Sequence, residues 1–343
     1  MNENVREGVY LNLDLQLVGD RLYGLREVFF ERYFTMRKMQ IITEQFTKTS
    51  LPIPFFMSKE VLNEIHFLIK AKKDKVEEIL KRIEQKFLFA QLKSLLYAVG
   101  EFYRESKKYS LDKNIKKVKR IRMERLKKCK EIGLTSESEF GDIFNDNDKI
   151  NTVKEIIDLL TNEFLEIVRI YIPDWNPYDE KWENVNLIDY NECPLRSKRY
   201  IHRLINLIAE EYVISRRVII DINYRRGDHY KPAITEYRDA LDHIVKSFFL
   251  PPDDAIRELN FASEHIRRAA VESVQDYVIS RLEERASVLI ILNSNERKKH
   301  ELLKKIFDIY DEICIGRYLK GTQHWHFAIY HFYEALNKVL KLG

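Results

Sequence analysis

Glycine and proline are scarce in this chain, with 10 and 8 residues respectively among 343. Both residue types end helices and build tight turns, so a chain with few of them has few turns and long helices. No segment alternates apolar and polar residues over a length typical of a strand. Through most of the chain the apolar residues instead recur at helical spacing. The sequence therefore predicts an all-α protein built of helical bundles.

Cysteine is also rare, and long apolar runs are missing. The three cysteines, Cys129, Cys193 and Cys314, are odd in number and far apart, which argues against a disulfide framework and favours a reducing compartment. No apolar run reaches the length of about 18 residues that a membrane-spanning helix needs. Residues 1–17 lack the basic start and the apolar stretch of a signal peptide. We expect a cytoplasmic protein with no membrane partner.

Motifs for cofactors and metals are missing as well. The chain has no glycine-rich phosphate loop, no dinucleotide-binding fingerprint and no nucleophile elbow. No pair of cysteines or histidines has the spacing of a zinc site, and His324-Trp325-His326 lies in an aromatic segment without a matching acid or thiol. We therefore expect no cofactor and no metal.

What the sequence does contain is an uneven distribution of charge. The net charge is only +4, yet residues 104–131 hold thirteen Lys or Arg against four acids. Residues 173–194 hold six acids against one Lys, together with three prolines and two tryptophans. We expect this breaker-rich segment to divide the chain. The predicted parts are an N-terminal helical domain for sensing or partner binding, an acidic aromatic connector and a C-terminal helical bundle, at residues 1–172, 173–196 and 197–343.

The basic segment is a candidate nucleic-acid-binding helix. Cations on a helix neutralise the phosphates of a polyanion and release its counterions. The candidate residues are Lys116, Lys117, Lys119, Arg120, Arg122 and Arg125. A solvated helix is the alternative interpretation, because the basic residues of this segment do not all fall on one face.

The helix expected at residues 231–249 carries the clearest candidate for chemistry. Opposite its apolar stripe lie Asp239 and His243, which are four residues apart and can therefore hydrogen-bond. A carboxylate beside an imidazole fixes its tautomer and raises its basicity, and a nearby arginine such as Arg238 can bind a phosphate bidentately. These residue types suffice for RNA cleavage without a metal. The apolar stripe is predicted to consist of Ile234, Tyr237, Leu241, Ile244 and Phe248.

The run Arg238-Asp239-Ala240-Leu241-Asp242-His243 resembles the R-x4-6-H motif of the HEPN superfamily, in which a polar residue commonly follows the arginine. HEPN proteins are small helical bundles, usually dimers, with two such motifs facing across the interface. Many are metal-independent ribonucleases of toxin or antiphage systems. The resemblance covers about residues 197–343. It implies a HEPN-like C-terminal bundle, catalytic Arg238, Asp239 and His243, RNA as the substrate, and a homodimer or a larger complex.

Two functions are open at this point. The first is a metal-independent endoribonuclease in a prokaryotic antiphage defence or toxin system. Arg238 and His243 lie about 140° apart around one helix, so a second copy of the motif would then help to aim both at one phosphate. The second is a non-catalytic helical adaptor that binds protein or nucleic acid within a larger complex, with the motif on an ordinary solvated helix face. The two differ in whether these side chains share a polar cleft or lie isolated on the surface.

Overall fold

The computed structural model describes residues 15–33, 36, 53–106, 115–135, 138, 140–144, 146–171, 195–292, 295–322 and 324–342. Within these ranges every regular element is a helix and no strand occurs, which confirms the predicted all-α class. None of these helices is long and apolar enough to span a bilayer.

The chain divides into two compact units. The first comprises Met1–Arg203 with Val245–Ala255, and the second comprises Leu204–Ile244 with Ile256–Gly343. Nearly all of the predicted connector at residues 173–196 lies outside the described residues, so a division of the chain there stays a prediction.

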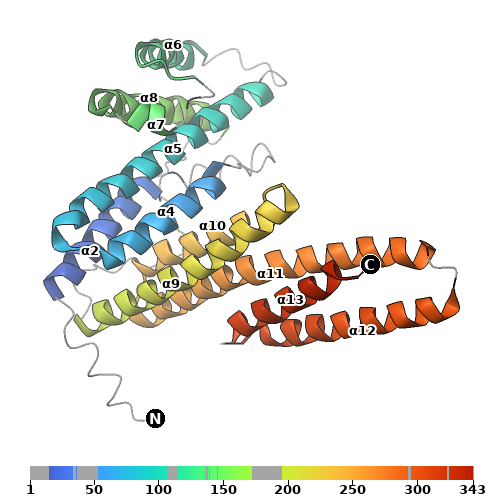
Figure 1. Cartoon of the computed structure of the whole chain (residues 1–343). Coiled ribbons are helices and arrows are strands. Elements are labelled where there is room, and N and C mark those ends of the chain that lie inside the picture. Colours follow the sequence, from blue (N-terminus) through green and yellow to red (C-terminus); the bar gives the residue numbers. More distant parts are fainter. Residues whose placement is uncertain are drawn as a thin grey trace. The chain divides into compact units, whose positions relative to one another are not determined.

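The first unit is built from two groups of helices (Figure 1). In one group α4 lies beside α5, and in the other α6 and α7 pack against α8, which also contacts α5. Apolar residues of α8 from Ile150 to Val168 recur at helical spacing, and most of them are buried, so α8 forms one wall of a core that it shares with α5 and α6. The elements are α2 (Leu15–Val28), the π-helix η1 (Phe29–Tyr33), α4 (Ile53–Lys70), the 3-10 turn η2 (Lys73–Lys75), α5 (Val76–Ser106), α6 (Ile115–Glu131), α7 (Phe140–Phe144) and α8 (Asn147–Tyr171).

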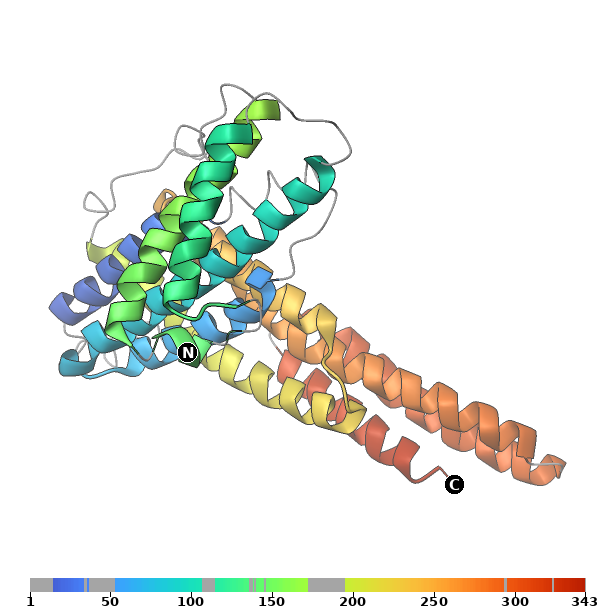
Figure 2. The same ribbon diagram turned by 90° about the horizontal axis from the view of Figure 1, so that it is seen from above.

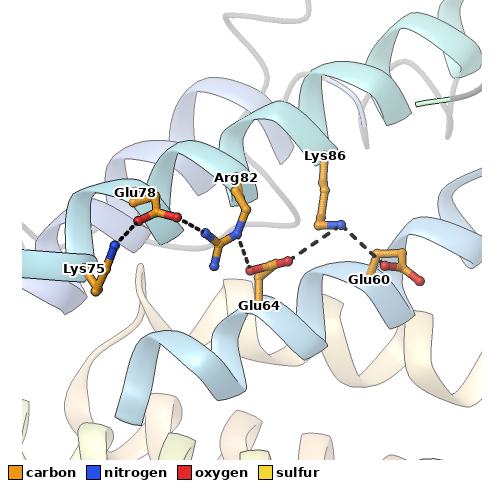
Figure 3. A network of polar contacts seen from close by, with 6 residues as sticks. All are labelled: Glu60, Glu64, Lys75, Glu78, Arg82 and Lys86. Carbon is orange, nitrogen blue, oxygen red and sulfur yellow. Dashed lines mark hydrogen bonds and ion pairs between the residues drawn. The ribbon is translucent and has the colours of Figure 1, made fainter. Parts of the chain in front are cut away.

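A chain of alternating charges joins α4 to η2 and α5 (Figure 3). Arg82 lies at its centre, with Nη1 2.9 Å from Glu78 Oε1 and Nε 3.0 Å from Glu64 Oε2. Lys86 Nζ lies 3.8 Å from Glu64. Such partly exposed pairs contribute little stability each. We call this set the charge ladder, and it consists of Glu60, Glu64, Lys75, Glu78, Arg82 and Lys86.

The second unit takes its core from one face each of α9, α11, α12 and α13. α12 and α13 run antiparallel beside each other (Figure 1), and Figure 2 shows α11 and α12 side by side as well. Fully buried residues at the centre of this core are Ile222, Val274, Val278, Ile313, Phe332 and Ala335. The second unit contains all of α12 (Glu296–Leu319) and α13 (Trp325–Leu340) and most of α9 (Leu195–Arg226), α10 (Lys231–Ser247) and α11 (Pro252–Leu292).

A glycine allows α12 and α13 to approach closely. Gly316 is buried in the last turns of α12, and the ring of Phe332 on α13 lies over it. A Cβ at this position would stand 2.9 Å from two carbon atoms of the ring, which is closer than carbon atoms pack. The absence of a side chain at residue 316 is therefore what lets the large ring fill the interface.

Candidate active site

The structure confirms which face of α10 packs inward. Tyr237, Leu241 and Ile244 are buried, as is Phe248 just after the helix, whereas Ile234 is half-buried. The remaining surface of α10 carries the motif residues, and each of them is half-buried. The motif therefore lies at a partly sheltered surface and not on a fully solvated face.

Arg238 and Asp239 pair with each other. Arg238 Nε donates to Asp239 Oδ1 at 2.7 Å, and Nη2 lies 2.5 Å from the same oxygen. The two side chains are 22% and 29% exposed. A phosphate that approached Arg238 would meet the negative charge of Asp239 first. Two nitrogens of Arg238, Nε and Nη2, are therefore already paired with a carboxylate when a phosphate approaches.

The carboxylate that contacts His243 comes from α11 and not from Asp239. His243 Nδ1 lies 2.7 Å from Glu258 Oε2. A carboxylate at Nδ1 holds the proton on that nitrogen and leaves Nε2 available for proton transfer. The predicted hydrogen bond from Asp239 to His243 is therefore wrong, because each of these two residues has another partner.

A second imidazole lies against the first. His265 on α11 places its Nδ1 2.7 Å from Glu236 Oε2 on α10, so each of the two helices contributes one histidine and one glutamate. The rings of His243 and His265 stack with their centroids 5.0 Å apart and 23° between their planes. The fold thus brings two imidazoles, each held at Nδ1 by a glutamate of the other helix, to one place.

A cation and an aromatic ring adjoin these histidines. Arg268 Nε lies 3.3 Å from Glu236 Oε2, and its Nη2 lies 2.7 Å from His265 Nδ1. Phe261 is 39% exposed, and its ring centroid lies 5.4 Å from that of His243. Among the residues that the structure describes, no three His, Cys, Asp or Glu side chains are grouped so as to hold a metal ion. We call the two stacked histidines and the side chains that contact them the histidine cluster: Glu236, His243, Glu258, Phe261, His265 and Arg268.

A third histidine–glutamate pair provides a comparison within the same chain. His331 Nδ1 on α13 lies 2.7 Å from Glu312 Oε2 on α12, and Lys338 Nζ donates to the other oxygen at 2.8 Å. These two hydrogen bonds lower the pKa of Glu312 below its usual value. The ring contact of His331 is with Tyr330 and not with an imidazole. This pair joins two helices and has the geometry of the other two without their stacked partner.

The packing of α6 leaves some of the cations predicted to bind nucleic acid exposed, and it pairs the others with neighbouring side chains. Lys116, Lys119 and Arg120 are exposed and form no ion pair with a described residue. Lys117 Nζ, by contrast, donates to Glu166 Oε1 at 2.8 Å. The guanidinium of Arg122 lies 4.6 Å from the centre of the Tyr103 ring.

Arg125 differs from the expectation. Its side chain is 9% exposed, and its Nε donates to Oε2 of the fully buried Glu163 at 2.7 Å. The hydroxyl of Tyr103 donates to the other carboxylate oxygen at 2.8 Å. A buried guanidinium that compensates a buried carboxylate is not available to a phosphate. Arg125 therefore joins α6 to α8 and does not belong to a nucleic-acid-binding surface.

Comparison of the chain with protein families, with curated proteins and with solved structures finds no match in any of the three. The interpretation of the histidine cluster accordingly rests on its own geometry.

Proposed function

We propose that the protein is an endoribonuclease that works without a metal ion, with the histidine cluster as its active site. The observation that supports this best is the stacking of His243 on His265, each hydrogen-bonded through Nδ1 to a glutamate. Cleavage of RNA by its own 2′-hydroxyl needs one base and one acid, and imidazole serves as either near neutral pH. The HEPN-type assignment and a role in antiphage defence or as a toxin are part of the proposal and rest on the motif at Arg238–His243.

The charges around the two histidines suggest their roles. Arg268 places a positive charge beside His265 and not beside His243, so we assign His265 as the base and His243 as the acid. Arg268 Nη2 lies 3.2 Å from Nε2 of His265, so Arg268 must first turn from the ring to the phosphate. Nε2 of His265 then accepts the proton of the ribose 2′-hydroxyl, and the 2′-oxygen attacks the adjacent phosphorus. The bond from phosphorus to the 5′-oxygen breaks, and His243 gives its proton to that oxygen.

The products are a 2′,3′-cyclic phosphate and a 5′-hydroxyl, and no other reactant is consumed. Glu258 and Glu236 hold the rings in place, and Arg268 stabilises negative charge that develops on the phosphate oxygens. Phe261 offers an exposed ring on which a base can stack. Because His265 belongs to the same chain as His243, the mechanism needs no second copy of the motif.

Removal of either imidazole tests the proposal. His243→Ala and His265→Ala should each lower the cleavage rate of a labelled RNA by about 100-fold or more, the usual scale for a positioned acid or base. The matched control is His331→Ala, which removes an imidazole held by a glutamate at the same 2.7 Å. Rates are measured on denaturing gels with EDTA present, and thermal melts establish that each variant is folded.

Three results would contradict this assignment. The first is wild-type cleavage by His243→Ala, and the second is an equal loss of cleavage in His331→Ala. The third is a product with a free 3′-hydroxyl, because attack by the 2′-oxygen leaves a cyclic phosphate that mass spectrometry can detect.

A helical adaptor without catalytic activity is the second candidate, and one surface favours it. Along α12 a row of side chains recurs at intervals of three and four residues and is exposed. Such a row on one helix face is typical of surfaces that bind another helix. The opposing residues Leu302, Ile306 and Ile309 pack inward. We call the exposed row the α12 stripe: Leu303 (42% exposed), Phe307 (66%), Tyr310 (43%), Cys314 and Tyr318 (81%).

We propose a second copy of this chain as the partner of the α12 stripe. If two α12 helices pair antiparallel about a twofold axis, Phe307 of each faces Tyr310 of the other, and Leu303 faces Cys314. The same alignment places Lys304 of each copy beside Asp311 of the other, which gives two attractive pairs. On the opposite flank it places Lys299 near Arg317, but the charge of Lys299 is offset by Glu296, which lies 3.0 Å away in the same chain. A parallel pair would instead bring Lys304 towards Lys299.

A further inference from the structure

Helix α6 has two faces of different chemistry. Its inner face, with Val118, Arg125 and Cys129, is buried and packs against α8. Its outer face carries five exposed cations, and none of them forms an ion pair with a residue in the described part of the chain. These cations are Lys116, Lys119, Arg120, Lys127 and Lys130.

The five cations form one row. At about 100° per residue they fall within an arc of about 100° on the helix surface, and Met123, which is 68% exposed, lies near the middle of that arc. From Lys116 to Lys130 the row extends for about 21 Å. Glu124 and Glu131 lie at its edge. We call these five residues the α6 cation row.

The other cations of α6 are used inside the protein. Lys117 and Lys128 pair with Glu166 and Glu155 of α8, as Arg125 pairs with Glu163. The packing of α6 on α8 therefore neutralises the inward cations and leaves the excess positive charge of this helix on the outer face. A row of unpaired cations at this density attracts a polyanion.

We propose that the α6 cation row binds the phosphate backbone of single-stranded RNA. The choice of RNA rests on the proposed function, whereas the charges alone select a polyanion. An acidic membrane is the other common polyanionic surface. A helix that binds a membrane inserts a free apolar face into the lipid, and the apolar face of α6 is occupied by α8.

The number of cations sets the expected salt dependence. Each phosphate contact on a single strand contributes about −0.7 to the slope of the logarithm of the binding constant against the logarithm of salt concentration. Five contacts give a slope of about −3.5. The affinity should then fall about 100-fold when monovalent salt is raised from about 50 to about 200 mM.

The test compares two variants that lose the same charge. The row variant changes Lys116, Lys119, Arg120, Lys127 and Lys130 to Gln, which keeps the helix propensity of exposed positions. The control variant changes five exposed cations of the second unit to Gln: Lys298, Lys305, Arg317, Lys320 and Lys341. Both changes are made in the full chain with His243→Ala, so that cleavage does not interfere. Binding of a labelled RNA strand of about 20 nucleotides is followed by fluorescence anisotropy at several salt concentrations.

We expect the row variant to lose at least about 30-fold in affinity at low salt and to approach a slope of zero. The control variant should bind within about 3-fold of its parent with an unchanged slope. Equal losses in both variants would mean that net charge alone binds RNA and would overturn the proposal. Unchanged binding by the row variant would do the same, and so would stronger binding to phosphatidylserine vesicles than to RNA.

This outcome is independent of the proposed active site. RNA binding that depends on the row, without any cleavage by the wild type, would refute only the proposed active site. Cleavage that depends on His243 and His265, with binding that ignores the row, would refute only the inference about α6.

Discussion

His202 is the single residue with the clearest consequence for pH dependence. It is 4% exposed, and its Nε2 has no hydrogen-bond partner among the described residues. Burial, and then the positive charge of Arg21, lower its pKa to about 4. In an unfolded chain the imidazole titrates near its ordinary value of 6.5. Between about pH 4 and pH 6.5 the imidazole is therefore neutral in the folded protein and protonated in the unfolded chain.

We expect this histidine to destabilise the protein in mild acid. Because the unfolded state binds more protons in this window, the free energy of unfolding falls as the pH drops from about 6.5 towards 4, by up to about 3 kcal/mol. His202→Phe keeps an aromatic ring and removes the titration. Urea unfolding is measured at pH 7 and at pH 4.5. The fall in the free energy of unfolding between these pH values should be about 2 kcal/mol smaller for the variant than for the wild type. Equal losses would show that His202 does not titrate in this way.

The sequence singled out His243 but not the residues that surround it in the candidate site. Asp239 was expected as its partner because a spacing of four places two residues on one helix face. Glu258 is fifteen residues away and on α11, and the stacked His265 is on α11 as well. No local pattern encodes which face of α11 meets α10. The two half-buried histidines, each with a glutamate on the facing helix, become visible only after packing is known.

At the scale of one helix pair, Gly316 determines how closely α12 and α13 pack. A methyl group there must displace the ring of Phe332, which is fully buried. Overpacking of this kind lowers the free energy of unfolding by about 1–3 kcal/mol, whereas the better helix propensity of alanine raises it by about 1 kcal/mol. The steric term is therefore the larger of the two.

We expect Gly316→Ala to lower the free energy of unfolding by about 1 kcal/mol. The matched control is Gly100→Ala in α5, where an added Cβ meets no atom within 4 Å. That variant should raise the free energy of unfolding by up to about 1 kcal/mol, because only the propensity term acts. Urea denaturation of both variants measures the difference. A stabilised Gly316→Ala would mean that the ring moves without cost.

Helices themselves were the most predictable part of this chain. The stripe of α10 was predicted from spacing alone, and its main members are buried, because a period of 3.6 residues is a local property. Which cations of α6 are buried and which are exposed could not be predicted in the same way. Arg125 and Arg120 are both basic residues of one basic run, and only the position of Glu163 on α8 shows that the first is buried.

At the scale of the whole molecule, the α12 stripe predicts how two chains assemble. Leu303→Cys should form a disulfide with Cys314 of a second copy under mild oxidation, because an antiparallel pair puts these positions opposite each other. Non-reducing gels should show a covalent dimer. Lys305→Cys is the control, since this exposed residue lies on another side of α12.

Charge reversal gives a second measure of the same pairing. Asp311→Lys should weaken the dimer in sedimentation experiments, and the addition of Lys304→Asp should restore it, because the two residues exchange roles across the axis. An equally cross-linked Lys305→Cys protein, or a wild-type chain that stays monomeric at every concentration, would rule out the antiparallel pair.

The charge ladder has a consequence for how α4 finds its register on α5. Apolar packing alone discriminates poorly between alignments that differ by one helical turn, because helix surfaces repeat about every turn. A slip of one turn in one direction would place Glu64 opposite Glu78 in place of Arg82, and two carboxylates would then repel each other. Ion pairs with one exposed partner, such as Glu64–Arg82, contribute little to the stability of the final structure. They can nonetheless distinguish the native alignment from its nearest competitor while the chain folds.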